Sequence, residues 1–405
     1  MTGRSHALPP EFALLAACAL LDTERLAEVA PPLARNEGFD WDRFVELGLF
    51  HGVAQVARAR LDAIAPGAIP ARHAEALKRL AVQDAALYAA HARLTVRILA
   101  ALAAHDLPAL VLKGAGLAGQ LYAPVPELRA SSDIDILVPE DRFAAADRIL
   151  RDAGLARDWP EADVPPDAMR MFLRLDNVFE YAGPVSGERV ELHCRATVNP
   201  HALPVSFEEL SAASVAVETG HGTIPTPGGP LLTAYLCQHL LWQPPYRLKW
   251  LGDIARVLRQ AGAASCADHV ASYLRPLPLR PARPTDEVLA WLGQAIGQAA
   301  GGPAAAAPGR RAARVIAALQ APRGHSQTRT LARLPFELGL LLSVVPLVSG
   351  WRGVAYETLL ALADPRDAVS LRLTPRFAAV YAVTGPILAL FRYARRGKQA
   401  RIPQD

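Results

Sequence analysis

The sequence predicts an α+β protein in which a small β-sheet core is flanked by N-terminal helices and by a larger C-terminal helical region. Two observations predict strands, because apolar and polar residues alternate in residues 133–138 and again in residues 189–193. A third observation predicts helices, because apolar residues recur at helical spacing before residue 107 and after residue 229. We therefore divide the 405 residues into an N-terminal helical region (1–106), a core (107–228) and a C-terminal helical region (229–405).

The composition is that of a globular chain, with 51% apolar and 20% charged residues. The formal net charge of +4 is small for this length, so it gives no reason to expect a nucleic-acid partner. The chain has four cysteines, and their spacing fits neither a metal site nor a disulfide framework. We therefore expect the reducing cytoplasm as the compartment.

The N-terminal region is a series of helices. Residues 12–21 are apolar but flanked by prolines and acidic residues, so they predict the first helix of the protein rather than a signal peptide. Asp40 is placed to cap a helix that begins at Trp41, and Gly48 and Gly52 are candidate breaks in it. Residues 71–105 predict one very long helix or two shorter ones.

The core is organised around Ser132-Asp133-Ile134-Asp135-Ile136. Side chains alternate along a strand, so Asp133 and Asp135 share one face and the isoleucines share the other. Burial of two neighbouring carboxylates without a cation is costly. Open solvent or a bound divalent metal resolves this cost, and hard cations such as Mg²⁺ take carboxylate oxygens as ligands.

An apolar run, residues 107–112, precedes this strand and ends in Lys113-Gly114, after which residues 115–122 predict a short helix. A strand, a glycine turn and a helix start place backbone N–H groups where an anion can bind. Arg129 lies just before the carboxylates and can bind a phosphate through two N–H groups. An ordinary turn and a solvated arginine are the alternatives.

Glu191 is the candidate for a third carboxylate. Residues 177–195 predict a hairpin with its turn at 183–187, in which Glu191 and His193 share one face and Val190 and Leu192 the other. An exposed edge strand is the alternative. Elsewhere in the core we expect a helix over 141–153, a loop or lid over 156–168, and a short hairpin formed by 214–218 and 222–224.

The C-terminal region predicts helices over 231–241 and 248–258. Arg247, Lys249 and Asp253 cluster at the start of the second helix, where they either reach into the active cleft or pair on the surface. Two later apolar stretches, 338–348 and 377–391, are shorter than the roughly 20 residues needed to cross a bilayer. The second is followed by a basic tail, which fits either an anionic membrane surface or water.

Taken together, Lys113-Gly114, Leu121-Tyr122, Arg129, Ser-Asp-Ile-Asp-Ile-Leu-Val and Glu191-Leu192-His193 resemble the uncharacterised bacterial nucleotidyltransferase family of the polymerase-β-like superfamily. The resemblance covers most of the chain, including Phe50-His51-Gly52-Val53 and residues 247–253. It implies a mixed β-sheet, two Mg²⁺ ions, and transfer of a nucleoside monophosphate from an NTP to an acceptor with release of pyrophosphate. The acceptor, whether small molecule, peptide or protein, is not implied.

By the family pattern, Asp133, Asp135 and Glu191 hold the metals and are catalytic. The residues expected to bind substrate are Lys113, Gly114, Arg129, Ser132, His193 and Lys249. His193 either orients the nucleophile or a carboxylate, or only supports the structure. The common superfamily turn is Gly-Ser, whereas this chain has Lys113-Gly114. That departure leaves open a second function, a catalytically inactive nucleotide-binding or scaffold protein of the same fold.

Overall fold

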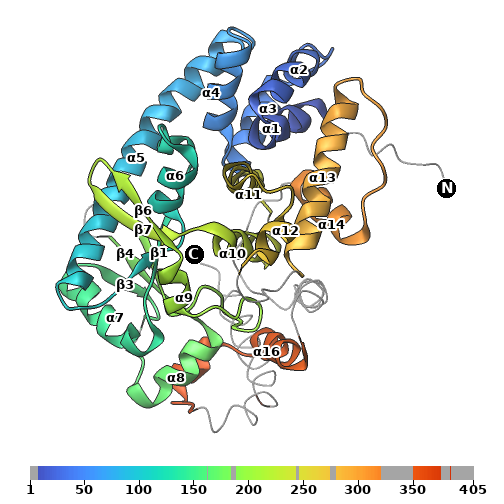
Figure 1. Cartoon of the computed structure of the whole chain (residues 1–405). Coiled ribbons are helices and arrows are strands. Elements are labelled where there is room, and N and C mark those ends of the chain that lie inside the picture. Colours follow the sequence, from blue (N-terminus) through green and yellow to red (C-terminus); the bar gives the residue numbers. More distant parts are fainter. Residues whose placement is uncertain are drawn as a thin grey trace, which may run out of the picture. The chain divides into compact units, whose positions relative to one another are not determined.

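The computed structural model of the protein describes residues 8–161, 163–183, 188–242, 246–273, 280–320, 350–374 and 384. It has the predicted α+β fold, with a five-stranded mixed sheet, a two-stranded sheet and many helices (Figure 1). The N-terminal helices are α1 (Pro10–Leu20), α2 (Thr23–Ala34), α3 (Trp41–His51), α4 (Ala54–Ile64) and α5 (Ala71–Ala103). The C-terminal helices are α10 (Gly229–Trp242), α11 (Leu248–Ala261), α12 (Cys266–Ala271), α13 (Ala282–Ala299), α14 (Arg310–Gln320), α16 (Gly350–Leu362) and α17 (Pro365–Ser370).

In the sequence, the strands and the remaining helices come after the N-terminal helices and before the C-terminal ones. The strands are β1 (Leu110–Val111), β2 (Asp133–Leu137), β3 (Ala156–Trp159), β4 (Val178–Ala182), β5 (Arg189–His193), β6 (Ser214–Thr219) and β7 (Gly222–Pro227). The helices are α6 (Gly114–Tyr122), α7 (Phe143–Asp152), α8 (Pro166–Leu175) and α9 (Phe207–Ala212), with the 3₁₀ turns η1 (Pro126–Leu128) and η2 (Glu140–Arg142).

The chain forms two compact units, each assembled from separate stretches of sequence. The first unit contains Met1–Arg97, Val111–Ile134 and Leu210–Arg323, and the second contains Ile98–Leu110, Asp135–Glu209 and Gly324–Asp405. In four places the boundary falls inside an element, namely α5, β1, β2 and α9. The three linear regions expected from the sequence are a different division of the chain and stay a prediction.

The five-stranded sheet has the strand order β1-β2-β5-β4-β3. Strand β4 is antiparallel to both β5 and β3, and Glu180 of β4 lies opposite Glu191 of β5. The end of β2 is joined to β5 by the amide of Val138, which donates to the carbonyl of His193 at 3.0 Å. The hairpin formed by β4 and β5 is the one predicted from the sequence, and residues 184–187 of its turn lie outside the described residues.

One face of this hairpin is apolar and covered by helices of the second unit. Phe179 of β4 stacks edge to face against Phe143 of α7 and Phe172 of α8, with ring centroids 4.9 and 5.4 Å apart. Val190 and Leu192 of β5 are fully buried, as the alternation of the sequence predicts. Glu191 lies between these two residues on β5, so its side chain is on the other face of the sheet.

The expectation of a loop or lid over residues 156–168 is wrong at both ends, because residues 156–159 form β3 and α8 begins at Pro166. Strand β3 carries no run of apolar residues, and its polar side chains are bound by residues 10 and 17 positions away in the sequence. Arg157 donates to Asp147 of α7 at 3.0 Å, and the indole of Trp159 donates to Asp176 at 3.0 Å. Polar contacts of this kind leave no apolar periodicity in the sequence from which a strand could be predicted.

In the first unit, α1 is the central helix. Every residue from Glu11 to Leu20 is buried, and α1 packs against α2, α3, α4, α11 and α13. The predicted cap at Asp40 is confirmed, since its side chain accepts from the amide of Arg43 at 3.0 Å. Helix α3 continues through Gly48 and ends at Gly52, whose backbone is left-handed with φ +67°.

Residues 71–103 form one helix, α5, rather than two. Among the described helices, α5 is also the one long and apolar enough to cross a membrane by length and composition, a test that core helices meet as well. The apolar stretches 338–348 and 377–391 and the basic tail lie outside the described residues apart from Thr384, so the membrane-surface contact stays a prediction.

Helix α6 packs against the hairpin formed by β6 and β7, and two glycines make the close approach possible (Figure 1). A Cβ atom added at Gly119 would lie 2.5 Å from Cγ1 of Val217, and one added at Gly116 would lie 3.1 Å from Cβ of Thr226. Thr226 also donates through its hydroxyl to the carbonyl of Val111 at 2.7 Å, which fixes the hairpin beside the strand before α6.

Candidate active site

Three potential metal ligands gather in the second unit. Asp135 comes from β2 and Glu191 and His193 from β5, and one ligand atom from each lies within 4.8 Å of the others. Nε2 of His193 lies 3.3 Å from Oδ1 of Asp135 and 3.4 Å from Oε2 of Glu191. Asp135 is fully buried, and the side chains of His193 and Glu191 are only 10% and 15% exposed. The imidazole therefore lies between two carboxylates that are largely shielded from water.

Electrostatics follow from this arrangement. Burial acts to lower the pKa of His193, but the close carboxylates of Asp135 and Glu191 outweigh it and raise the pKa to about 9. The two carboxylates thus favour the protonated imidazole, which offsets part of their charge, and a metal that takes His193 as a ligand would displace that proton. Two carboxylates and an imidazole form a donor set that fits a divalent cation, since oxygen suits hard cations and imidazole suits transition metals.

A second basic residue approaches Glu191 from the same strand. The Nη2 atom of Arg189 lies 2.8 Å from Oε1 of Glu191 and 3.1 Å from Oε1 of Glu180. Glu180 and Glu191 are directly opposite in the β4–β5 register, so the guanidinium relieves repulsion between two like charges. Glu191 is thus held between Arg189 and His193.

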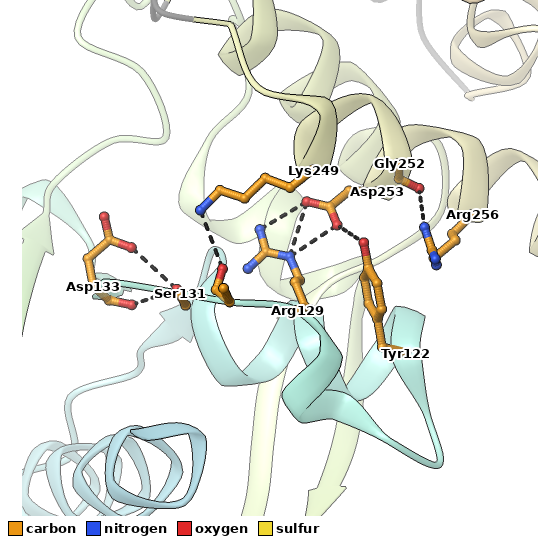
Figure 2. Close-up of polar contacts among 9 residues, drawn as sticks. Tyr122, Arg129, Ser131, Asp133, Lys249, Gly252, Asp253 and Arg256 are labelled. Carbon is orange, nitrogen blue, oxygen red and sulfur yellow. Dashed lines mark hydrogen bonds and ion pairs between the residues drawn. The ribbon is translucent and has the colours of Figure 1, made fainter. Parts of the chain in front are cut away.

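The remaining predicted residues lie in the first unit, around the loop that leads into β2. Ser131 donates through its hydroxyl to the carbonyl of Asp133 at 3.1 Å and lies 3.4 Å from its Oδ1 atom (Figure 2). Ser132, the serine expected to bind substrate, is exposed. Asp133 begins β2 and is half-buried, two positions before Asp135 on the same strand.

Arg129 is bound by an aspartate from α11. Its Nε and Nη2 atoms donate to Asp253, with a distance of 2.9 Å from Nη2 to Oδ2, and both side chains are almost completely buried. Burial acts to lower the pKa of Arg129, but the charge and hydrogen bonds of Asp253 outweigh it and raise the pKa. Tyr122, at the end of α6, donates to the same carboxylate at 2.8 Å, and Arg256 stacks on its ring at 4.1 Å (Figure 2).

Lys249 also comes from α11 and reaches the same loop. Its Nζ atom donates to the carbonyl of Ala130 at 3.3 Å (Figure 2). Burial, together with the charge of Arg129, lowers the pKa of Lys249 to about 8, although Asp133 and Asp253 oppose the shift. Of the two alternatives for Arg247, Lys249 and Asp253, surface pairing is therefore wrong for Asp253, which is fully buried, while the half-buried Lys249 reaches the loop.

The Lys113-Gly114 turn lies next to this loop. Gly114 begins α6 with φ +61°, and a Cβ atom there would lie 3.3 Å from the backbone oxygen of Asp133. Helix α6 has no side-chain cap at its N-terminus. A small recess, partly open to solvent, is lined by residues of α5, the start of α6 and the loop. They are Asp84, Leu87, Tyr88, His91, Gly114, Ala115, Arg129, Ala130 and Ser131.

The structure thus brings the sequence-predicted residues together in two groups. Asp135, Glu191 and His193 meet in the second unit, while Lys113, Arg129, Asp133 and Lys249 surround one loop in the first. The shared ligation by Asp133, Asp135 and Glu191 and the individual substrate-binding roles stay predictions. Sequence reasoning missed the contacts made by Tyr122, Ser131 and Arg189; for Arg189, its alternation with Glu191 on β5 was an available signal.

Comparison with known proteins gives one result. A family profile described as an uncharacterised nucleotidyltransferase matches residues 37–283, which is more than half of the chain and includes α3, the β-strands and α11. No match was found among curated proteins or among solved structures.

Proposed function

The chain belongs to this uncharacterised nucleotidyltransferase family, and we propose that it transfers a nucleoside monophosphate from an NTP to an acceptor in a metal-dependent reaction. The observation that carries the proposal is the cluster of Asp135, Glu191 and His193. These residues fit a divalent cation by their chemistry and spacing, and the matching family is described as a nucleotidyltransferase. We propose Mg²⁺ as the metal and two ions per site, as the family resemblance implies.

Asp135 and Glu191 are the proposed ligands in the second unit, with His193 beside both. Asp133 is two positions from Asp135 on β2, and strand alternation favours it as a further ligand. A bound divalent cation would lower the pKa of an acceptor hydroxyl and stabilise the charge on the leaving pyrophosphate. In the reaction the acceptor oxygen bonds to the α-phosphorus, the bond from that phosphorus to the β-phosphate oxygen breaks, and the acceptor loses its proton.

The residues around the loop in the first unit are proposed to bind the triphosphate. Backbone N–H groups at the start of α6 and the cations Lys113, Arg129 and Lys249 favour negative charge there. Ser132 is exposed beside them and is kept as a proposed substrate contact. Arg129 and Lys249 are held by hydrogen bonds to Asp253 and Ala130 before any substrate binds, so little reorganisation of these two groups opposes the reaction.

The proposal is tested by incubating the protein with Mg²⁺ and each of the four NTPs, labelled at the α- or the γ-phosphate. We expect release of labelled pyrophosphate from the γ-label and transfer of the α-label when an acceptor is present. A protein that neither binds nor turns over any NTP with any divalent cation would contradict the proposal.

A second function is favoured by one contact, the ion pair of Arg189 with Glu191 at 2.8 Å, which occupies a proposed metal ligand. In that case the protein binds a nucleotide without turnover. The same assay distinguishes the two, because the second function gives NTP binding by equilibrium dialysis but no pyrophosphate. We propose the cytoplasm as the compartment, since all four cysteines are buried free thiols.

A further inference from the structure

The end of α3 and the start of α11 form a specific junction in the first unit, although almost 200 residues separate them in the sequence. Nδ1 of His51 accepts a hydrogen bond from the amide of Leu248 at 3.3 Å, at the first residue of α11. The guanidinium of Arg247 stacks on the ring of Phe50 at 3.8 Å and donates to the Phe50 carbonyl. This junction therefore fixes the residue at which α11 begins.

Gly52 ends α3 directly beneath the side chain of Lys249. A Cβ atom at Gly52 would lie 2.9 Å from Cδ of Lys249 and 3.6 Å from its Cγ. The aliphatic part of the lysine thus crosses the α3 terminus in van der Waals contact, and the site has no room for a methyl group. At the far end of the side chain, Nζ donates to Ala130 in the loop that leads to Asp133.

The position of Lys249 is costly for the helix that carries it. A lysine in the first turn places positive charge at the electropositive end of α11. Burial disfavours the ammonium further, and of the charged groups near it, Arg129 and Lys113 repel it while Asp133 and Asp253 attract it. The helix terminus and desolvation therefore oppose a cation at this position, whereas the hydrogen bond to Ala130, the two nearby carboxylates and an anion bound beside the loop favour it.

We propose that His51 and Gly52 are positioning residues that hold Lys249 extended across the end of α3, so that its amine binds a phosphate of the NTP beside the loop 129–133. A lysine side chain has four rotatable bonds, and confining it before substrate arrives removes most of the entropy that binding would otherwise lose. The identity of the anion rests on the proposed function, while the positioning of Lys249 does not.

The first experiment compares Gly52→Ala with Gly262→Ala. Gly262 ends α11 with φ +62°, and no atom lies within 4 Å of a Cβ built there, so both variants carry the same backbone strain but only Gly52→Ala meets Lys249. Acylation of the Lys249 amine is measured by peptide mass spectrometry. We expect the rate to rise roughly tenfold in Gly52→Ala, because displacement exposes the amine, and to stay within about twofold of wild type in Gly262→Ala.

Equal labelling rates in the two glycine variants would overturn the proposal. A double-mutant cycle keeps the result interpretable if Gly52→Ala is poorly folded. In the Lys249→Ala background the clash is absent, so Gly52→Ala should lower the melting temperature no more than Gly262→Ala does, by about 2–4 °C. If Gly52→Ala still lowers the melting temperature more than Gly262→Ala does in the Lys249→Ala background, Gly52 acts independently of Lys249.

The second experiment substitutes His51 and measures substrate binding through the KM for NTP. Asparagine at position 51 keeps an acceptor near the Leu248 amide, whereas leucine removes it. We expect His51→Leu and Lys249→Met each to raise the KM for NTP on the order of tenfold, and His51→Asn to retain most of the wild-type affinity. No change in KM in any of these variants, with turnover intact, would refute the phosphate contact. A wild-type protein without turnover, but with the expected labelling pattern, would refute the proposed function alone.

Discussion

At the scale of single residues, Asp135 is the buried carboxylate on which the proposed chemistry depends most. We predict that Asp135→Asn lowers metal-dependent NTP turnover by roughly a hundredfold or more, because it removes an anionic ligand. The fold should persist, since the amide is nearly isosteric and one of two close like charges is lost. The exposed Asp141→Asn is the matched control and should retain wild-type turnover.

Thermal melting separates ligand loss from unfolding in this variant. The wild type should gain stability when Mg²⁺ and NTP are added together, by mass action, and Asp135→Asn should gain much less. Full turnover in Asp135→Asn, or an equal gain in melting temperature, would remove Asp135 from the site.

The buried pair of Arg129 and Asp253 gives a second prediction at this scale. Asp253→Asn leaves the Arg129 guanidinium buried without its counter-charge, and we expect a loss of about 3–5 kcal/mol in the free energy of unfolding. Tyr122→Phe removes one hydrogen bond to the same carboxylate and should cost about 1 kcal/mol. Urea unfolding at constant m-value measures both, and equal effects would mean that the ion pair is not what stabilises this loop.

At the scale of elements, the junction of α3 and α11 makes stability depend on pH. Burial lowers the pKa of His51 to about 3, so the folded protein holds it neutral while the unfolded chain takes up a proton near pH 6.5. The unfolded state binds more protons between these values, and stability therefore falls as the pH falls from about 6.5 toward 3. The slope is at most about 1.4 kcal/mol per pH unit for this one group.

We predict that His51→Asn removes this contribution, because asparagine does not titrate. When the pH is lowered from 7 to 5, the free energy of unfolding of the wild type should therefore fall by roughly 2 kcal/mol more than that of His51→Asn. Denaturant unfolding of both proteins at several pH values isolates the contribution of His51, since all other titratable groups are common to both proteins. Parallel curves would contradict the assignment of a neutral, buried His51.

The packing of α6 on the β6–β7 hairpin gives another prediction for elements. Gly119→Ala forces a methyl group against Val217 and should cost about 1–3 kcal/mol, and most of the loss should be recovered with Val217→Ala. Gly293→Ala in α13 has open space around it and should stabilise by about 0.5–1 kcal/mol through helix propensity. Melting of the wild type, Gly119→Ala, Val217→Ala, their double variant and Gly293→Ala tests this, and a loss unaffected by Val217→Ala would assign the cost to another contact.

The elements that the sequence predicted are those with a local pattern. Strands β2 and β5, the β6–β7 hairpin, α10 and α11, and the cap at Asp40 follow from alternation, periodicity and turn residues. Strand β3 was missed because it is stabilised by Asp147 and Asp176, which accept hydrogen bonds from its side chains and lie outside the strand. In the candidate site, Asp135, Glu191 and His193 were found by alternation, whereas the pairing of Arg129 with Asp253 has no local signal at a separation of 124 residues.

At the scale of the whole molecule, each unit combines stretches that are far apart in the sequence. The first unit needs residues 210–323 to complete it, including α10 and α11. We predict that a chain ending at residue 228 is insoluble or unfolded, because it lacks Asp253 and the helices that pack on α1 and α6. Solubility and circular dichroism measure this outcome. A soluble truncated chain that melts cooperatively would show that residues 229–405 are a separate module.

The pairing of Arg129 with Asp253 also fixes an order of events during synthesis. The ribosome makes Arg129 long before it makes Asp253, and the 124 residues between them take roughly 6–25 s at about 5–20 residues per second. Throughout that interval the nascent chain carries the loop before β2 without the carboxylate that allows its arginine to be buried. The loop therefore reaches its final conformation only after α11 has left the ribosome, and the proposed nucleotide site forms late in the life of the growing chain.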